Sequence, residues 1–249
     1  MVFVPQSFKR IEVIRIGLLL LLLVMLVMGA IPSYLTGQWP WMHQPKVTSI
    51  KQLQTLQQEG LSLPDWTTVQ QQIMQIGNNK WSVQEMEWQG TPSQANQSDK
   101  IILLLLPQTW HTNRPQVEWM DINGAQNWTV DSRRRVRFAA DRSDAISAQP
   151  PIQIEARFLR GWNRQQTYAV LQWYAWPHGG NPAPGPWFWV DQRSQWRDRQ
   201  RTPWVAVSLL IPIKPLGKIE PYIDFAKSLG QTIQSALISG PLAAADGSL

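Results

Sequence analysis

The chain of 249 residues contains no cysteine and only three histidines. Without cysteine it can form no disulfide, no thiolate metal site and no cysteine nucleophile. None of the histidines has a second histidine or an acidic residue at metal-ligand spacing, so we expect neither a metal nor a cofactor. A chain of this length can bury enough apolar surface to fold without disulfides in an exported location.

The common catalytic motifs are missing as well. The sequence holds no G-x-S-x-G elbow, no Walker loop and no G-x-G-x-x-G fingerprint. Acidic residues are few, and several lie within two residues of an arginine, as Asp131 and Asp198 do. The sequence therefore predicts a protein that is not an enzyme. A hydrolase with His178 as its base is the enzymatic alternative.

One long hydrophobic run stands near the N-terminus. Residues 16–31 read IGLLLLLLVMLVMGAI without a charge, and with residues 13–15 they approach the roughly 20 residues that a bilayer requires. Three basic residues and a single glutamate lie on the N-terminal side, which predicts a cytoplasmic N-terminus and an exported remainder. Trp39 and Trp41 follow at interfacial depth. We therefore predict a single-pass signal anchor. A signal peptide cleaved near residues 27–29 is the alternative, and it also exports the rest.

Hydrophobic periodicity divides the chain into four parts. Residues 1–35 are the cytoplasmic N-terminus and transmembrane anchor. Residues 36–64 are a tether with an amphipathic helix over 46–59, where apolar residues recur at helical spacing before Gly60. Residues 65–240 form the exported domain, and residues 241–249 form a disordered tail.

Within the exported domain the pattern predicts mainly strands. Period-two alternation predicts strands at 81–88, 117–122, 128–138, 152–159, 167–176 and 204–213. The apolar run 101–106 predicts a strand buried on both faces, and helices are predicted over 67–76, 187–200 and 220–239. The fold class is therefore α+β, with a single N-terminal transmembrane helix followed by a largely antiparallel sheet covered by helices.

Arginine is concentrated in one part of the chain. The formal net charge is +6, and twelve of the fifteen arginines fall between residues 133 and 201. For an exported domain this favours anionic lipid headgroups or an acidic polymer such as an exopolysaccharide over nucleic acid, which is not an expected partner. The simpler interpretation is a solvated face on alternate strand positions.

Five tryptophans lie in residues 173–198, which read WYAWPHGGNPAPGPWFWVDQRSQWRD. Flat rings with polar neighbours suit stacking on sugars, so the candidate ligand-binding residues are Trp176, His178, Trp187 and Trp189. The structural interpretation is favoured, in which these rings join the hairpin to the helix that follows and fix how that helix packs on the sheet.

Four segments carry a family resemblance: GLSLPDW, IGNNKWSVQ, VLQWYAWPHG and TPWVAVSLLIPI. With the N-terminal anchor and the C-terminal amphipathic helix, they resemble the exosortase-associated protein family. More narrowly, they resemble the cyanobacterial branch, described as cyanoexosortase B system-associated. The resemblance covers roughly residues 60–240 and includes no catalytic signature.

The resemblance implies a partner role. Exosortases are multi-pass membrane enzymes that process proteins bearing a PEP-type sorting signal, and they are often encoded beside exopolysaccharide machinery. It implies that this chain is a membrane-tethered, non-enzymatic accessory protein of an exosortase, with its domain in the periplasm. In a cyanobacterial cell the inner (plasma) membrane is the expected location, and the thylakoid membrane is the alternative. A polysaccharide-binding module that uses exposed tryptophans is the alternative function.

Overall fold

The computed structural model describes residues 6–36, 45–90, 98–141 and 150–243. The chain divides into two compact units, Met1–Gln44 and Pro45–Leu249. The first unit is the helix α1 (Gln6–Thr36), whose side chains are described over residues 12–28 and are exposed throughout, including fourteen large apolar ones. Within the described part of the chain, no helix combines the length and the apolar character needed to cross a membrane.

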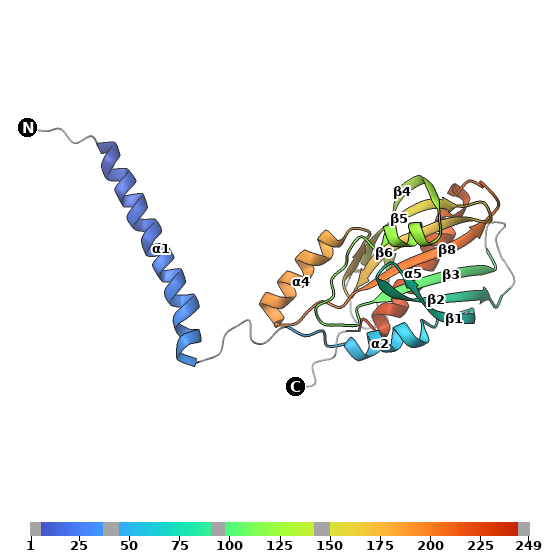
Figure 1. Cartoon of the computed structure of the whole chain (residues 1–249), viewed down its shortest axis with the longest axis horizontal. Helices are drawn as coiled ribbons and strands as arrows, with labels where there is room; N and C mark the ends of the chain where they lie inside the picture. Colours follow the sequence, from blue (N-terminus) through green and yellow to red (C-terminus); the bar gives the residue numbers. More distant parts are fainter. Residues whose placement is uncertain (1–5, 37–44, 91–97, 142–149, 244–249) are drawn as a thin grey trace, which may run out of the picture. The chain divides into compact units, whose positions relative to one another are not determined.

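The second unit is built on an eight-stranded sheet with the order β1-β2-β3-β8-β6-β7-β5-β4 (Figure 1). All strand pairs are antiparallel except the single parallel bridge between β5 and β7. The strands are β1 (Trp66–Ile76), β2 (Asn79–Trp88), β3 (Lys100–Pro107), β4 (Thr129–Ala140), β5 (Ile152–Trp162), β6 (Thr167–Trp176), β7 (Gly179–Asn181) and β8 (Val205–Ile213). The helices are α2 (Ile50–Glu59), α3 (Trp119–Ala125), α4 (Pro184–Asp198), the 3-10 turn η1 (Glu220–Tyr222) and α5 (Ile223–Ser239). This confirms the predicted α+β class with a largely antiparallel sheet.

The sheet is covered on both faces, so the unit has two hydrophobic cores. On one face α2 and α5 pack over side chains such as Leu171 and Trp173. On the other face, α3, α4 and the loop before α3 pack over Tyr174, with Trp187 and Trp204 in the same cluster. Every residue of β6 is buried as a result, which explains why its sequence is apolar at consecutive positions.

Helix α2 belongs to this folded unit, although the sequence analysis assigned it to the tether. Leu53 is fully buried and Leu56 is 4% exposed, both in the core under α2. Gly60 ends the helix as predicted, with a φ of 78° and its N–H donating to the carbonyl of Leu56 at 3.0 Å. A Cβ at Gly60 would lie 2.4 Å from the side chain of Gln84, so only glycine fits this position.

The predicted helix over 67–76 is wrong, because these residues form strand β1. The strand lies at the edge of the sheet, and only its first and last residues, Trp66 and Ile76, are buried. A bulge between Thr68 and Gln70 interrupts the register. An exposed, bulged edge strand shows no clear period of two, so its polar, glutamine-rich sequence gave no strand signal.

The predicted strand over 117–122 is also wrong, because Trp119–Ala125 forms helix α3. Its two buried residues, Trp119 and Ile122, are three positions apart and share one face of the helix. In so short a segment the apolar spacing fits either period, and packing against β1 and β6 decides the outcome.

The chain remains folded beyond residue 240. Leu242 is fully buried in the core with α5, and its N–H donates to the carbonyl of Leu237 at 2.8 Å. This contact closes the C-terminal end of the helix. Of the predicted disordered tail, residues 241–243 are therefore ordered, and residues 244–249 lie outside the described residues.

Candidate functional site

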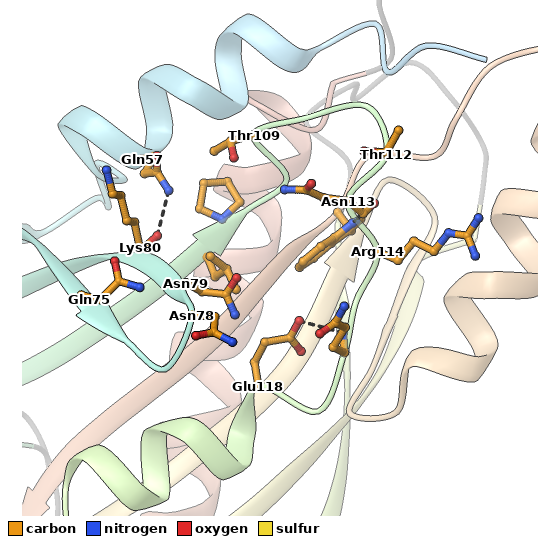
Figure 2. A pocket seen from close by; sticks show the side chains of 14 residues that line it. Gln57, Gln75, Asn78, Asn79, Lys80, Thr109, Thr112, Asn113, Arg114 and Glu118 are labelled. Atoms are coloured by element: carbon orange, nitrogen blue, oxygen red, sulfur yellow. Dashed lines mark hydrogen bonds between the residues drawn. The ribbon is translucent and has the colours of Figure 1, made fainter. Parts of the chain in front are cut away.

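A polar cleft of about 510 Å³ lies where the β1–β2 turn, the end of α2 and the loop of residues 108–118 meet (Figure 2). We call it the amide cleft, because six of its lining side chains are carboxamides. Figure 2 shows the turn residues on one side and the loop residues on the other. The lining residues are Gln57, Gln75, Asn78, Asn79, Lys80, Leu106, Pro107, Thr109, Thr112, Asn113, Arg114, Gln116, Glu118 and Trp204.

Much of the hydrogen-bonding capacity of the lining is open to a ligand. The Gln57 side chain already forms a hydrogen bond within the protein, since its Nε2 donates to the Lys80 carbonyl at 2.8 Å. Asn78, Asn79 and Asn113 make no side-chain hydrogen bond with another described residue. Each carboxamide can donate two hydrogen bonds and accept two. The cleft can therefore bind groups that both donate and accept, such as hydroxyls.

The β1–β2 turn is held in place by α3. Gly77 has a φ of 60°, and a Cβ at this position would lie 2.3 Å from a carboxylate oxygen of Asp121 on α3. A glycine is therefore needed both for the backbone conformation and for the close approach. The close packing of this turn against α3 places Asn78 and Asn79 at the edge of the cleft.

A buried acid and phenol lie beneath the cleft. Glu118 is 3% exposed, and its Oε1 accepts from the backbone N–H of Gln116 at 2.7 Å. The hydroxyl of Tyr174 donates to the Glu118 carboxyl group and lies against the carbonyl of Gln116. Burial raises the pKa of Glu118 and of Tyr174, and the charge of Glu118 raises the pKa of Tyr174 further. This pair anchors the loop to strand β6.

Other hydrogen bonds fix the conformation of the loop that carries Asn113. The buried Gln108 donates through Nε2 to the Asn113 carbonyl at 3.0 Å. The carbonyl of His111 accepts from Arg201 at 2.8 Å, and its Nδ1 accepts from the N–H of Val47 at 3.0 Å. The loop is thus preorganised, which lowers the entropy cost of binding a ligand.

The cleft has a positive edge. Lys80 and Arg114 line it and form no ion pair with another described residue. Glu118 is the only acidic side chain among the described lining residues, and its raised pKa favours the neutral form relative to an ordinary glutamate. The local charge therefore favours ligands that carry anionic groups.

The four candidate residues from the sequence do not line this cleft. Trp176 is 5% exposed and Trp187 is 1% exposed, so neither ring offers a face for stacking on a ligand. Trp187 packs edge-on against Trp204 with ring centroids 6.4 Å apart, and its Nε1 donates to the Thr202 carbonyl at 3.3 Å. These rings join α4 to the sheet, in line with the structural interpretation.

The other two candidates are exposed in different places. Trp189 is 72% exposed on the outer side of α4, and His178 is exposed on the turn between β6 and β7. The structure therefore does not assemble the four residues into one stacking surface. Sequence reasoning missed the amide cleft, because its lining comes from segments as distant as residues 57, 78–80, 109–118 and 204.

Three of the four arginines of β4 form ion pairs in which the arginine side chain is exposed. Arg135 and Arg137 both contact Glu155, at 2.7 Å and 3.3 Å, and Arg134 contacts Glu220 at 2.5 Å. Pairs this exposed contribute little to stability. For this strand the interpretation as a solvated face fits best.

Comparison with protein-family models, with curated proteins and with solved structures found no match. Among the described residues, no group of three His, Cys, Asp or Glu side chains is placed to hold a metal ion. The amide cleft is therefore interpreted from its own geometry and chemistry.

Proposed function

We propose that the protein is a membrane-anchored, non-enzymatic accessory protein of an exosortase-type sorting and exopolysaccharide export system. In this proposal its exported domain binds a segment of acidic polysaccharide in the amide cleft. The observation that carries the proposal is the cleft itself, with open carboxamides on opposite sides and cations at its edge.

The chemistry of the cleft matches an acidic sugar chain. Sugar hydroxyls both donate and accept hydrogen bonds, as the side chains of Asn78, Asn79 and Asn113 do. Acidic sugars add carboxylate or sulfate groups, which Lys80 and Arg114 can bind with charge-assisted hydrogen bonds. The cleft volume, about 510 Å³, lies within the ordinary range for ligand sites.

The lining favours retention of a sugar chain over its hydrolysis. Glycosidases usually place two carboxyl groups on either side of the scissile bond. In the described lining Glu118 is the one carboxylic acid, and it is occupied by Tyr174 and by the backbone of Gln116. This supports a binding role for the cleft.

The uncharged hydrophobic run of residues 16–31 in the sequence supports the proposed anchor, and α1 contains this run. Its described side chains over residues 12–28 are exposed on all sides of the helix, and the uncharged run in the sequence continues to residue 31. A helix that is apolar around its whole circumference suits a lipid environment. The anchor would hold the domain at high local concentration beside a membrane-bound partner.

The family resemblance and the cleft coincide in position. The segment IGNNKWSVQ supplies Asn78, Asn79 and Lys80, and the segment TPWVAVSLLIPI supplies Trp204. Two of the four segments that resemble the exosortase-associated family thus line the cleft. This coincidence supports a cleft function that belongs to the accessory role.

Binding is tested by calorimetric titration of the full chain in mild detergent with alginate oligosaccharides, using dextran as the neutral control. We expect binding of alginate, weakened about thirtyfold by Asn78→Ala combined with Asn113→Ala, since each lost hydrogen bond contributes about 1 kcal/mol. Gln70→Ala, an exposed amide of β1 outside the cleft, is the matched control. Equal binding of alginate and dextran, or no effect of the double variant, would refute the cleft as the site.

The accessory role is tested separately by crosslinking in cells followed by purification in mild detergent. We expect an exosortase to co-purify with the full chain. Repeated absence of an exosortase from the crosslinked material would contradict the accessory role while leaving the binding result intact.

A further inference from the structure

Helix α4 presents two tryptophans and two arginines on one exposed face. Trp189 is 72% exposed and Trp196 is 87% exposed, and the Arg197 side chain is 81% exposed. Arg193 is exposed between them. The four residues occupy positions i, i+4, i+7 and i+8, which lie on the same side of a helix. We call them the aromatic–basic face.

The opposite face of α4 is firmly attached to the domain. Trp187 and Asp191 are each 1% exposed, and Asp191 pairs with Arg201 at 2.8 Å. The helix contacts the sheet through β6 and β7. The aromatic–basic face therefore cannot turn inward, and its rings stay in contact with whatever surrounds the domain.

The chain that leads to α1 leaves the domain at the C-terminal end of α4. Lys46 forms a parallel bridge with Gln200, two residues beyond the helix, and its carbonyl accepts from the N–H of Arg201 at 3.0 Å. The ten residues from Thr36 to Lys46 can span at most about 35 Å, and α4 is about 22 Å long. If α1 is the membrane anchor proposed above, α4 lies within reach of the same membrane surface.

We propose that α4 lies on the surface of the membrane that holds α1. In this arrangement Trp189 and Trp196 occupy the interfacial region, where amphipathic rings are favoured. Arg193 and Arg197 bind anionic lipid headgroups. The face carries no acidic residue that would repel such lipids, because Asp191 is buried on the opposite side and Asp198, nine positions after Trp189, also lies on the opposite side of the helix.

The shape of the face favours a lipid surface as its occupant. The two indoles project from a convex helix about 10 Å apart along its axis, and they flank the guanidinium of Arg193. Alternating aromatic and basic residues on an exposed helix are typical of helices that lie in the membrane interface. A second contact beside the tether would also restrict how the domain, and with it the amide cleft, is oriented at the surface.

The experiment uses the absence of native cysteine, which allows one label per chain. Gln192→Cys, next to the aromatic–basic face, and Thr55→Cys, on the exposed side of α2, are each labelled with the dye NBD in the full chain. The chains are reconstituted in phosphatidylcholine vesicles with or without 30% phosphatidylglycerol, and flotation shows whether the chain is bound to the vesicles.

In vesicles containing phosphatidylglycerol, we expect the fluorescence emission of the label at position 192 to shift to the blue and to be quenched by nitroxide lipids. The label at position 55 should remain in water. Trp189→Gln with Trp196→Gln should abolish the quenching, and Arg193→Gln should lower the membrane-contacting fraction relative to the free fraction about fivefold. Trp110→Gln, a 60% exposed ring in the loop of residues 108–118, should change nothing.

Chains that float with the vesicles while the label at position 192 stays in water would overturn the α4 contact and leave the anchor standing. Chains that fail to float would overturn both. Quenching at position 192 that requires added membrane proteins would assign the face to a protein partner and likewise overturn the proposal.

Discussion

The buried carboxylate of Asp191 should be one of the most sensitive positions in the molecule. Its side chain is 2% exposed and accepts hydrogen bonds from Arg201 at 2.8 Å, from the N–H of Thr202 at 2.9 Å and from Gln195 at 2.8 Å. Through Arg201 this carboxylate joins α4 to His111 in the loop that lines the amide cleft. Asp191→Ala would leave the guanidinium of Arg201, 7% exposed, without a counter-charge.

Removing one partner of a buried ion pair costs about 3–5 kcal/mol, because the other charge remains buried and unpaired. We therefore expect Asp191→Ala to lower the free energy of unfolding by about 3–5 kcal/mol. The assay is urea unfolding of the full chain in mild detergent, followed by tryptophan fluorescence. Helix α1 contains no tryptophan, so the signal reports mainly on the second unit.

Two further variants separate charge from packing. Asp198→Ala removes an acid that is 53% exposed and pairs with Arg197 at 3.6 Å, so it should cost less than about 1 kcal/mol. Asp191→Ala combined with Arg201→Met should cost less than Asp191→Ala alone, since no unpaired charge remains. If Asp191→Ala costs no more than Asp198→Ala, the reasoning about this buried pair is refuted.

Three further predictions use the same unfolding assay. Leu53→Ala should lower the free energy of unfolding by about 2–5 kcal/mol, because it opens a cavity under α2 in the core. A loss below about 1 kcal/mol would contradict the packing of this helix. Gly60→Ala should lower the free energy of unfolding by about 1 kcal/mol or more, since φ is 78° and an added Cβ would lie 2.4 Å from the Gln84 side chain. Gly124→Ala is the control: an added Cβ there meets no atom within 4 Å, so this variant should be neutral or stabilising. Burial raises the pKa of Glu118 above its ordinary value of 4.5, so the folded state binds this proton more tightly than the unfolded state. The resulting stabilisation is full below pH 4.5 and is lost as pH rises through the raised pKa. The free energy of unfolding of Glu118→Gln should therefore rise relative to that of the wild type as the pH increases from 4.5 to neutrality. If the two proteins lose or gain stability in parallel over this range, the raised pKa of Glu118 is contradicted.

The central strands could be predicted from the sequence, because both of their faces are buried. The apolar run 101–106 corresponds to β3, and the alternation over 152–159 and 167–176 corresponds to the hairpin of β5 and β6. In these segments local pattern and tertiary burial agree, so the period is visible in the residues themselves.

The elements that the sequence did not reveal are those whose structure depends on distant contacts. β1 is a strand because it pairs with β2 along its whole length, while its own side chains are mostly exposed. α3 is a helix because Trp119 and Ile122 pack on the sheet below. Local propensity is weak in both segments, and pairing or packing overrides it.

The same limit explains the site. The five tryptophans of residues 173–198 suggested a ligand-binding site, but Trp176 and Trp187 are buried and pack in the core. The turn residues 78–80 were visible as a polar Asn-Asn-Lys sequence, but their proximity to Asn113 and Trp204 depends on the sheet order. No local signal brings these segments together.

The central claim is that a polar polymer binds the exported domain at the amide cleft. The most direct test is hydrogen–deuterium exchange of the full chain in nanodiscs, with and without alginate oligosaccharides. Slower exchange on adding alginate is predicted for residues 75–80 and 109–118, with α5 unchanged. Protection confined to α4, or no protection of the cleft segments at saturating alginate, would contradict the account.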